Sequence, residues 1–372
     1  MKTNFVKLRW LFTMLLFVTT MIMPTMMLAK SIDLKIPEGD GAGTPYKIGT
    51  AEELYWFAGL VNGTLPGVKK DLSANAILTD DIIVNTGVLD PNKDLVSGND
   101  FIEWIPIGKS SSDDDAYTGT FDGNGHTISG LYFNKSNSWY VGLFGCIGAE
   151  GKIFNVGVSD SYFQSSNCPY IGGVCGSNSG ELQNCSNSST VIGKENEYRI
   201  GGVCGYNYGG TIKSCYNTAS VSGQYSVGGV SGSLGSDVTN CYYLSGTVAD
   251  GKSGIGGQKD ENGKAEKMSL EQFKSGEVAW LLNDSKSVST EESTLAWYQK
   301  LDENADAYPV LKSTDHNTVY KAPLFSCDGT TRIGEYANKP EGDKLSHNYQ
   351  MAEKADEGTS NLYSEECAIC HN

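Results

Sequence analysis

The sequence predicts an all-β protein, a parallel β-solenoid with short α-helical caps and a small C-terminal tail. Three observations predict this fold class. A glycine-flanked segment recurs four times at nearly constant spacing, and glycine makes up 45 of the 372 residues. Charged residues make up only 19% of the chain, below the usual quarter. Much glycine and little charge indicate many turns between short strands rather than long surface helices.

The first 29 residues have the pattern of a signal peptide. Three basic residues precede an apolar run from Trp10 to Met23, and the small residue Ala29 marks the cleavage position. An uncleaved membrane anchor is the alternative, because the apolar run is nearly long enough to span a bilayer. In both cases we expect the remaining chain to be exported, secreted or displayed on a bacterial cell surface, with no membrane contact beyond this segment.

Residues 30–140 are predicted to form an N-terminal cap and the first, irregular coils. Thr50 and Glu53 have the spacing of a capping box, and apolar residues then recur at helical spacing until Gly63. A helix at this position would cover the open end of the first coil. The runs 76–84 and 101–107 are strand-like.

The glycine-rich stretch Asp122-Gly-Asn-Gly-His126 contains an Asn-Gly pair between two short apolar segments. This pattern predicts a tight hairpin that joins Thr120-Phe121 to Thr127-Ile128. A phosphate or calcium site is the alternative for such a stretch, and a lone turn is weak support for it.

Residues 141–249 contain the repeat. Its glycine-flanked segments follow one another at steps of 31, 29 and 27 residues: Gly142-Leu-Phe-Gly145, Gly173-Val-Cys-Gly176, Gly202-Val-Cys-Gly205 and Gly229-Val-Ser-Gly232. A second short apolar segment follows each of them, and in some units a third. Such short strands cannot bury a face alone, so this period favours stacked coils. A propeller is the alternative, but its blades need about 40 to 45 residues.

The repeat also predicts columns of stacked side chains. One apolar column should run through the interior, formed by Leu143, Val174, Val203 and Val230. The glycines flank it where a Cβ would crowd the next coil or where the backbone needs a positive φ. Cysteines form two further columns, Cys175 with Cys204, and Cys185 with Cys215 and Cys241. We interpret them as buried core residues, with disulfides between adjacent coils as the alternative.

Residues 250–312 are predicted to form a C-terminal cap that closes the other end of the stack. It contains one helix at 269–283, which Ser269 and Gln272 open as a capping box. Both ends of a solenoid need such covers, because open strand edges pair between molecules.

The tail, residues 313–372, is polar and predicted to be weakly folded unless a metal organises it. Four of its side chains have a spacing that can hold a structural zinc ion: Cys327, His347, Cys367 and Cys370. A disulfide, free thiols and haem attachment at the Cys-x-x-Cys-His sequence are the alternatives. No other cofactor is expected.

The chain is acidic, with 28 basic and 44 acidic side chains and a formal net charge of −16. Such a surface repels a phosphate backbone, so nucleic acid is not expected as a partner.

The repeats resemble the GLUG motif of bacterial cell-surface proteins, which include adhesin-like proteins. The resemblance is carried by the four glycine-flanked segments together with the apolar segments that follow them, such as Ile153-Phe-Asn-Val156 and Thr211-Ile-Lys-Ser-Cys-Tyr216. It covers roughly residues 44–312. It implies a right-handed β-helix-like surface domain without a catalytic signature, and it names no ligand.

We therefore expect a non-catalytic binding or adhesion module whose rigid flank contacts a host or envelope glycan or protein. Tyrosines beside the coils are the candidate contacts, because tyrosine combines a large contact area with a polar tip: Tyr170, Tyr198, Tyr206, Tyr208 and Tyr225. A polysaccharide lyase or hydrolase is one alternative. A hydrolase needs two carboxylates about 5 to 9.5 Å apart, yet the acids within 141–249 share no register. A structural cell-envelope spacer is the other alternative.

Overall fold

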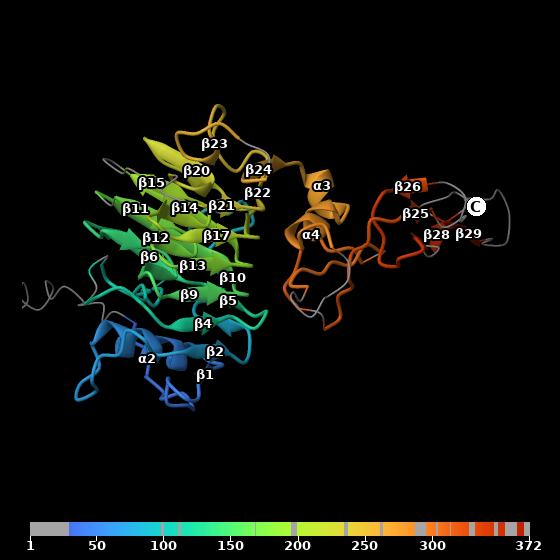
Figure 1. The fold of residues 1–372 in the computed structure, drawn as a ribbon. Coiled ribbons are helices and arrows are strands. Elements are labelled where there is room, and N and C mark those ends of the chain that lie inside the picture. Colours follow the sequence, from blue (N-terminus) through green and yellow to red (C-terminus); the bar gives the residue numbers. More distant parts are fainter. Residues whose placement is uncertain are drawn as a thin grey trace, which may run out of the picture. The chain divides into compact units, whose positions relative to one another are not determined.

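The computed structural model describes residues 30–372, except 98–99, 111, 113, 168, 195–198, 234–236, 261–262, 287–294, 303, 313, 327–331, 346–348, 354–362 and 368–372. The chain divides into one unit up to Ser31 and a second from Ile32 onward. In the second unit, short parallel strands are stacked coil upon coil (Figure 1). This arrangement confirms the predicted parallel β-solenoid.

Each regular coil contributes strands to three faces. Face 1 is a seven-stranded parallel sheet with the strands in chain order: β1 (Tyr46–Ile48), β2 (Ala76–Leu78), β4 (Thr120–Asp122), β9 (Lys152–Phe154), β13 (Glu181–Gln183), β17 (Thr211–Lys213) and β21 (Val238–Thr239).

Face 2 contains the longest strands. It consists of β3 (Ile82–Ile83), β5 (Thr127–Ser129), β10 (Gly157–Ser166), β14 (Ser186–Lys194), β18 (Tyr216–Asn217), β22 (Cys241–Leu244) and β24 (Ala265–Met268), with β6 (Tyr132–Ser136) beside β10 and β19 (Val221–Ser222) beside β14.

Face 3 carries the glycine-flanked segments. A bend at these glycines splits the first three coils into two strands each, and β20 continues through both rows. Its strands are β7 (Tyr140–Val141), β8 (Phe144–Ile147), β11 (Tyr170–Gly172), β12 (Cys175–Asn178), β15 (Arg199–Gly201), β16 (Cys204–Asn207), β20 (Ser226–Ser231) and β23 (Ser253–Ile255).

The predicted interior column is confirmed. Leu143, Val174, Val203 and Val230 are all fully buried. Backbone hydrogen bonds link the coils beside them: Val174 N–H donates to Val203 O over 3.0 Å, and Val203 N–H donates to Val230 O over 2.9 Å. The column residue of each coil thus packs on that of the next coil. The backbone hydrogen bonds between these residues fix the register of the coils.

The motif glycines are required by crowding between coils. A Cβ placed on Gly205 would lie 2.6 Å from Gly176 O and 2.6 Å from Ile171 N. A Cβ on Gly176 would lie 2.7 Å from Gly145 O and 2.7 Å from Val141 N. None of the eight glycines that bound the four segments has a positive φ. Of the two predicted reasons for these glycines, close backbone approach is therefore the one that applies.

A polar ladder marks the corner between faces 1 and 2. The residue after each of the last four face 1 strands adopts the left-handed conformation, with φ of 56° at Asn155, 52° at Asn184, 52° at Ser214 and 53° at Asn240. Asn184 Nδ2 donates to Asn155 Oδ1 over 3.0 Å, and Asn240 Nδ2 donates to Ser214 Oγ over 3.2 Å. Asparagine tolerates this conformation, and its amide links adjacent coils.

The predicted cysteine columns are confirmed as buried thiols. Six described cysteines are free and buried: Cys146, Cys175, Cys185, Cys204, Cys215 and Cys241. Cys175 and Cys204 are register partners on β12 and β16. Burial raises the pKa of Cys146 to about 12 and raises the pKa values of Cys175, Cys215 and Cys241 well above the usual range. No disulfide joins these six residues.

These thiols are expected to resist a thiol reagent such as DTNB at pH 8 until the protein is denatured, because burial keeps the reagent away from them. Peptide mapping by mass spectrometry after labelling would measure each site. Cys146, Cys175, Cys215 and Cys241 have higher thiol pKa values in the folded state than in the unfolded chain. The free energy of unfolding should therefore fall as the pH rises above the ordinary thiol pKa of about 8.5. Labelling of Cys175 or Cys204 in the native protein would contradict this expectation.

The N-terminal helix is confirmed. Helix α2 (Ala51–Asn62) begins after Thr50, whose side chain accepts from Glu53 N–H over 3.3 Å, and it ends at Gly63 with φ of 64°. The Glu53 carboxylate caps Gly49 N–H instead of the Thr50 N–H that a full capping box would use. Buried residues of α2, including Leu54 and Phe57, join the solenoid core.

The Asn-Gly hairpin prediction is wrong. Strand β4 belongs to face 1 and β5 to face 2, so the two strands do not pair with each other. Asn124 and Gly125, with φ of 50° and 79°, instead turn the chain from one face of the coil to the next. An Asn-Gly pair fits a hairpin and a turn between two faces equally well. Which of the two forms depends on the strands with which β4 and β5 pair.

The single helix predicted at 269–283 is also wrong. The chain forms α3 (Leu270–Lys274), opened by the predicted Ser269–Gln272 capping box, and α4 (Glu277–Leu282). Gly276 separates them with φ of 87°. Glycine has the freedom for this left-handed conformation, and it costs helix stability.

The C-terminal segment packs on the flank of the solenoid. The sequence had led us to expect it over the end of the stack. Phe273 and Val278 of the helices pack with Trp297 against Tyr216 and Tyr242 of face 2, in a cluster separate from the main core. The chain then returns toward the early coils, where Lys312 Nζ lies 2.7 Å from Asp81 Oδ2 beside β3. The outward tyrosines of face 2 explain this placement, because they need an apolar partner.

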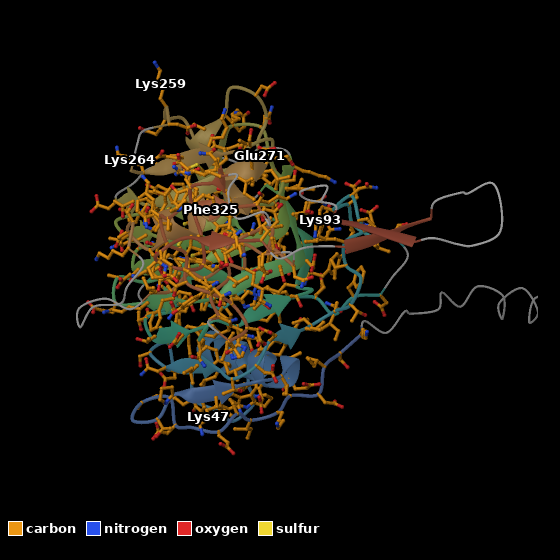
Figure 2. All side chains as sticks on the ribbon, turned by 90° about the vertical axis from the view of Figure 1, so that its right-hand side faces the viewer. Lys47, Lys93, Lys259, Lys264, Glu271 and Phe325 are labelled. Atoms are coloured by element: carbon orange, nitrogen blue, oxygen red, sulfur yellow. The ribbon has the colours of Figure 1, made fainter. Side chains whose placement is uncertain are left out.

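Charged residues protect the ends of the stack. Lys47 lies in the first strand, and Lys259 and Lys264 lie near the last strands (Figure 2). Lysine at a sheet edge disfavours pairing with another chain. The last turn is held by Asp260, which accepts from Tyr243 Oη over 2.8 Å and from Gly254 N–H over 2.6 Å.

Beyond the solenoid, the described chain forms small strands. They are β25 (Leu324–Phe325), β26 (Arg332–Gly334) and β27 (Asp343–Lys344) in one sheet, and β28 (Tyr349–Glu353) and β29 (Tyr363–Cys367) in another. Within the described ranges, no helix has the length and apolar character needed to cross a bilayer.

Candidate functional site

A row of aromatic rings crosses face 3. Tyr140 and Tyr170 are stacked with ring centroids 5.3 Å apart and planes 22° apart. Tyr170 and Tyr206 are stacked in the same way, at 5.3 Å and 19°. Tyr208 continues the row at 5.4 Å from Tyr206. These four residues, together with Arg199, are called the aromatic strip.

Arg199 supplies the cation of the strip. Its guanidinium carbon lies 4.1 Å from the ring centroid of Tyr206 and 5.5 Å from that of Tyr170. Its Nη1 also lies 3.4 Å from Tyr170 Oη. An arginine stacked on a ring keeps the outer edge of its planar guanidinium available for polar groups of a ligand.

The parallel register builds this row. Tyr140 pairs with Tyr170, and Tyr170 pairs with Arg199, so the three side chains lie one above another on consecutive coils. Tyr140, Tyr170, Arg199 and Tyr206 are half-buried, and Tyr208 is 60% exposed. The strip therefore combines fixed rings with accessible edges, which suits recognition at low entropic cost.

Exposed aromatic side chains extend this surface. Trp139 precedes Tyr140 and is 66% exposed. Tyr225 is 50% exposed and precedes Ser226, the register partner of Arg199 on β20. Isolated exposed rings need no explanation, but rings beside a stacked row enlarge one apolar and polar contact surface.

A cleft lies on face 1, between this sheet and the returning C-terminal segment. This flank cleft has a volume of about 730 Å³. The solenoid contributes Asn124, Gly125, His126, Lys152, Phe154, Asn155, Glu181, Gln183 and Asn184, and the C-terminal segment contributes Leu295, Ala296, Tyr298, Leu311, Lys312 and Thr314. Among the described residues of its lining, Glu181 is the one carboxylate, so these residues do not supply the carboxylate pair that glycoside hydrolysis uses.

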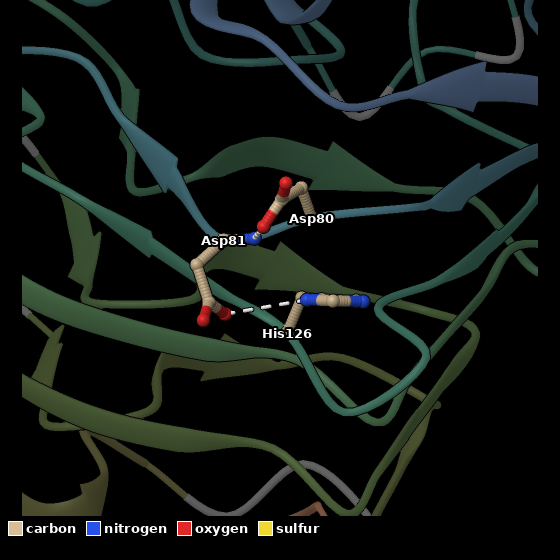
Figure 3. A group of neighbouring side chains, drawn as sticks. All are labelled: Asp80, Asp81 and His126. Atoms are coloured by element: carbon tan, nitrogen blue, oxygen red, sulfur yellow. Dashed lines mark hydrogen bonds and ion pairs between the residues drawn. The ribbon is translucent and has the colours of Figure 1, made fainter.

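Asp80, Asp81 and His126 meet at the edge of face 2, each with a ligand atom within 4.8 Å of the others (Figure 3). His126 Nδ1 lies 3.3 Å from Asp81 Oδ1, an ion-pair distance without a hydrogen bond. Asp81 already accepts from Thr127 N–H over 2.8 Å and pairs with Lys312. Burial opposes the charge of Asp81, but these contacts outweigh it and lower the pKa of the carboxyl. The group therefore holds the C-terminal segment, and it is a poor cation site because Lys312 already neutralises Asp81.

A comparison with protein families matches the GLUG motif to residues 196–222. This stretch contains β15 to β19, one strand or more from each face, so one motif corresponds to about one coil. The chain therefore contains a GLUG motif at residues 196–222. The resemblance predicted from its glycine-flanked segments is thus confirmed.

Two relatives are similar to parts of this chain. Halomucin of Haloquadratum walsbyi is 38% identical over 97 residues, which are 26% of this chain and 1% of halomucin. A protein named as a Gly-rich membrane protein, from Evansella cellulosilytica, is 33% identical over 84 residues, 22% of this chain and 9% of the relative. The chain therefore spans a small part of the length of either relative. No solved structure matches it.

The structure brings three of the five predicted tyrosines together. Tyr170, Tyr206 and Tyr208 lie in the aromatic strip, and Tyr225 lies on the neighbouring coil beside it. Tyr198 lies outside the described residues. The prediction missed Tyr140 and Arg199, although the spacing of 30 residues from Tyr140 to Tyr170 follows the repeat.

The predicted zinc ligands of the tail stay a prediction. Cys327, His347 and Cys370 lie outside the described residues, and Cys367 is placed only as the last residue of β29. The disulfide, free-thiol and haem-attachment alternatives for this tail also stay predictions.

Proposed function

We propose that this protein is a non-catalytic, secreted or cell-surface binding module, and that the aromatic strip contacts a host or envelope glycan. The observation that carries the proposal is the stacked row of Tyr140, Tyr170 and Tyr206 with Arg199 beside it. Tyrosine faces can stack on the C–H faces of sugar rings, and the hydroxyl and guanidinium edges can bond sugar hydroxyls.

Three further observations support this proposal. The N-terminal segment has the pattern of a signal peptide. One relative is named halomucin and another a membrane protein. The row also follows the solenoid axis over consecutive coils, so an extended ligand would meet several rings at once, which raises the affinity without any deep pocket.

A glycan array probed with the mature chain tests the proposal. We expect binding to at least one glycan class, weakened about tenfold or more in Tyr170→Ala and in Tyr206→Ala, since each change removes a stacked ring worth about 1 to 2 kcal/mol. Arg199→Lys should weaken binding less than Arg199→Ala, because lysine retains the charge but not the planar stacking.

Tyr132→Ala is the matched control. Tyr132 stacks on Tyr162 at 6.4 Å, on face 2 and away from the strip, so its loss should leave glycan binding unchanged. If the array is blank while a pull-down recovers a protein dependent on Tyr170, the ligand is a protein. If both assays are blank with folded material, the spacer hypothesis is favoured.

A further inference from the structure

The flank cleft has a rigid floor formed by face 1. Strands β9 and β13 pair in parallel, with Lys152 opposite Glu181 and Phe154 opposite Gln183. At the end of these strands, Asn184 Nδ2 donates to Asn155 Oδ1 over 3.0 Å, which ties the two corners together. The side chains of the floor therefore keep fixed spacings before any ligand arrives.

The C-terminal segment from Leu295 to Thr314 forms the roof of the cleft, and several contacts anchor it to the solenoid. Trp297 Nε1 donates to Ser214 O over 3.2 Å, and Tyr216 Oη donates to Pro309 O over 2.7 Å. Farther along, Lys312 pairs with Asp81. Two backbone hydrogen bonds of 2.8 and 2.9 Å between Tyr298 and Val310 brace the roof internally. The cleft is therefore preformed, and a ligand would not have to close it.

The charges of the cleft balance. Lys152 and Glu181 carry opposite charges on neighbouring strands, and within the described part of the chain neither has an ion-pair partner. The other lysine of the lining, Lys312, is neutralised by Asp81. The described lining residues thus present a strong donor and a strong acceptor side by side, and their charges balance in a chain whose formal charge is −16.

The remaining lining adds amides and aromatic faces. Gln183 lies beside Glu181 and offers both a donor and an acceptor. Phe154, from the floor, and Tyr298, from the roof, contribute rings. Paired donors and acceptors match vicinal hydroxyls, and rings match the C–H face of a sugar. A cleft of about 730 Å³ is within the range of small-ligand sites.

We propose that the flank cleft is a binding site for a short neutral oligosaccharide. Lys152 donates to a sugar hydroxyl, Glu181 accepts from one, and Gln183 bonds a third, while Phe154 and Tyr298 contact the ring faces. The site lies on face 1 and the aromatic strip on face 3, so the proposal does not depend on the function assigned to the strip.

Isothermal titration calorimetry of the mature protein with cellotriose, chitotriose, mannotriose and xylotriose tests this site, with trigalacturonate as the charged probe. We expect at least one neutral trisaccharide to bind with a Kd of about 1 mM or tighter. Lys152→Ala and Glu181→Gln should each weaken that binding about tenfold. Glu181→Gln preserves shape, so its effect would not come from misfolding.

Thr211→Ala is the matched control on the floor. Thr211 is the register partner of Glu181 on the next strand, and it is absent from the cleft lining. Thr211→Ala and Tyr170→Ala should both bind the trisaccharide like the unchanged protein. The proposal is overturned if none of the four neutral trisaccharides binds, if trigalacturonate binds more tightly than all of them, or if Lys152→Ala and Glu181→Gln bind normally.

Discussion

Gly205→Ala is expected to lower the free energy of unfolding by more than about 3 kcal/mol, because it adds a methyl group where two backbones already meet. The new Cβ would lie 2.6 Å from Gly176 O on the preceding coil and 2.6 Å from Ile171 N. Both are backbone atoms of strands that pair with neighbours on both sides, so neither can move aside as a flexible side chain would. The coils must separate locally, which also strains the neighbouring ladder.

Urea denaturation followed by circular dichroism measures this effect. Gly43→Ala is the matched control, since its Cβ would come no closer than 3.7 Å to another side chain and its φ is not positive. That variant should unfold within about 0.5 kcal/mol of the unchanged protein. Equal stability of the two variants would mean that the coils tolerate a wider spacing and that crowding does not explain the glycines of the motif.

The sequence determines the solenoid through features that repeat. The spacing of the glycine-flanked segments predicts one coil per unit, and Leu143, Val174 and Val203 predict the interior column because each occupies the same position in its unit. A periodic pattern needs no knowledge of distant contacts, since each coil meets a copy of itself. This explains why the fold and the buried cysteines were predictable.

The aromatic strip was only partly predictable, because one of its contacts crosses the repeat. Tyr140 and Tyr170 are register partners, so their stacking follows from the period. Tyr206 lies on β16, in the other row of face 3, yet stacks on Tyr170 of β11. Glycine contacts between the two rows, such as Gly205 against Ile171, bring these rings together. The spacing alone does not show that close approach.

The path of the C-terminal segment was not predictable either, since it has no counterpart in the repeat. A helix after the last coil satisfies the need for a cover equally well at the end or on the flank. Tyr216 and Tyr242 face outward and favour the flank, because they form the apolar surface on which Phe273 and Trp297 pack. In the sequence, these tyrosines could not be distinguished from those of the aromatic strip.

Trp297→Ala is expected to release the C-terminal segment from the flank while the solenoid stays folded. Trp297 is fully buried, its ring centroid lies 5.1 Å from that of Tyr216, and its Nε1 donates to Ser214 O. Removing a buried tryptophan costs about 3 to 5 kcal/mol, and here the loss falls on a segment attached outside the main core. Local opening is therefore expected before global unfolding.

Hydrogen exchange read by mass spectrometry distinguishes these levels. In the unchanged protein, the backbones of Tyr298 and Val310 are hydrogen-bonded to each other. In Trp297→Ala, the amides around these two residues should exchange at least tenfold faster, while those of Val174 and Val203 stay protected. Trp139→Ala, at a side chain that is 66% exposed, should change neither group. Because Tyr298 forms part of the roof of the flank cleft, trisaccharide binding should be lost together with the protection. Uniformly faster exchange in both groups would show instead that the segment and the solenoid unfold as one cooperative unit.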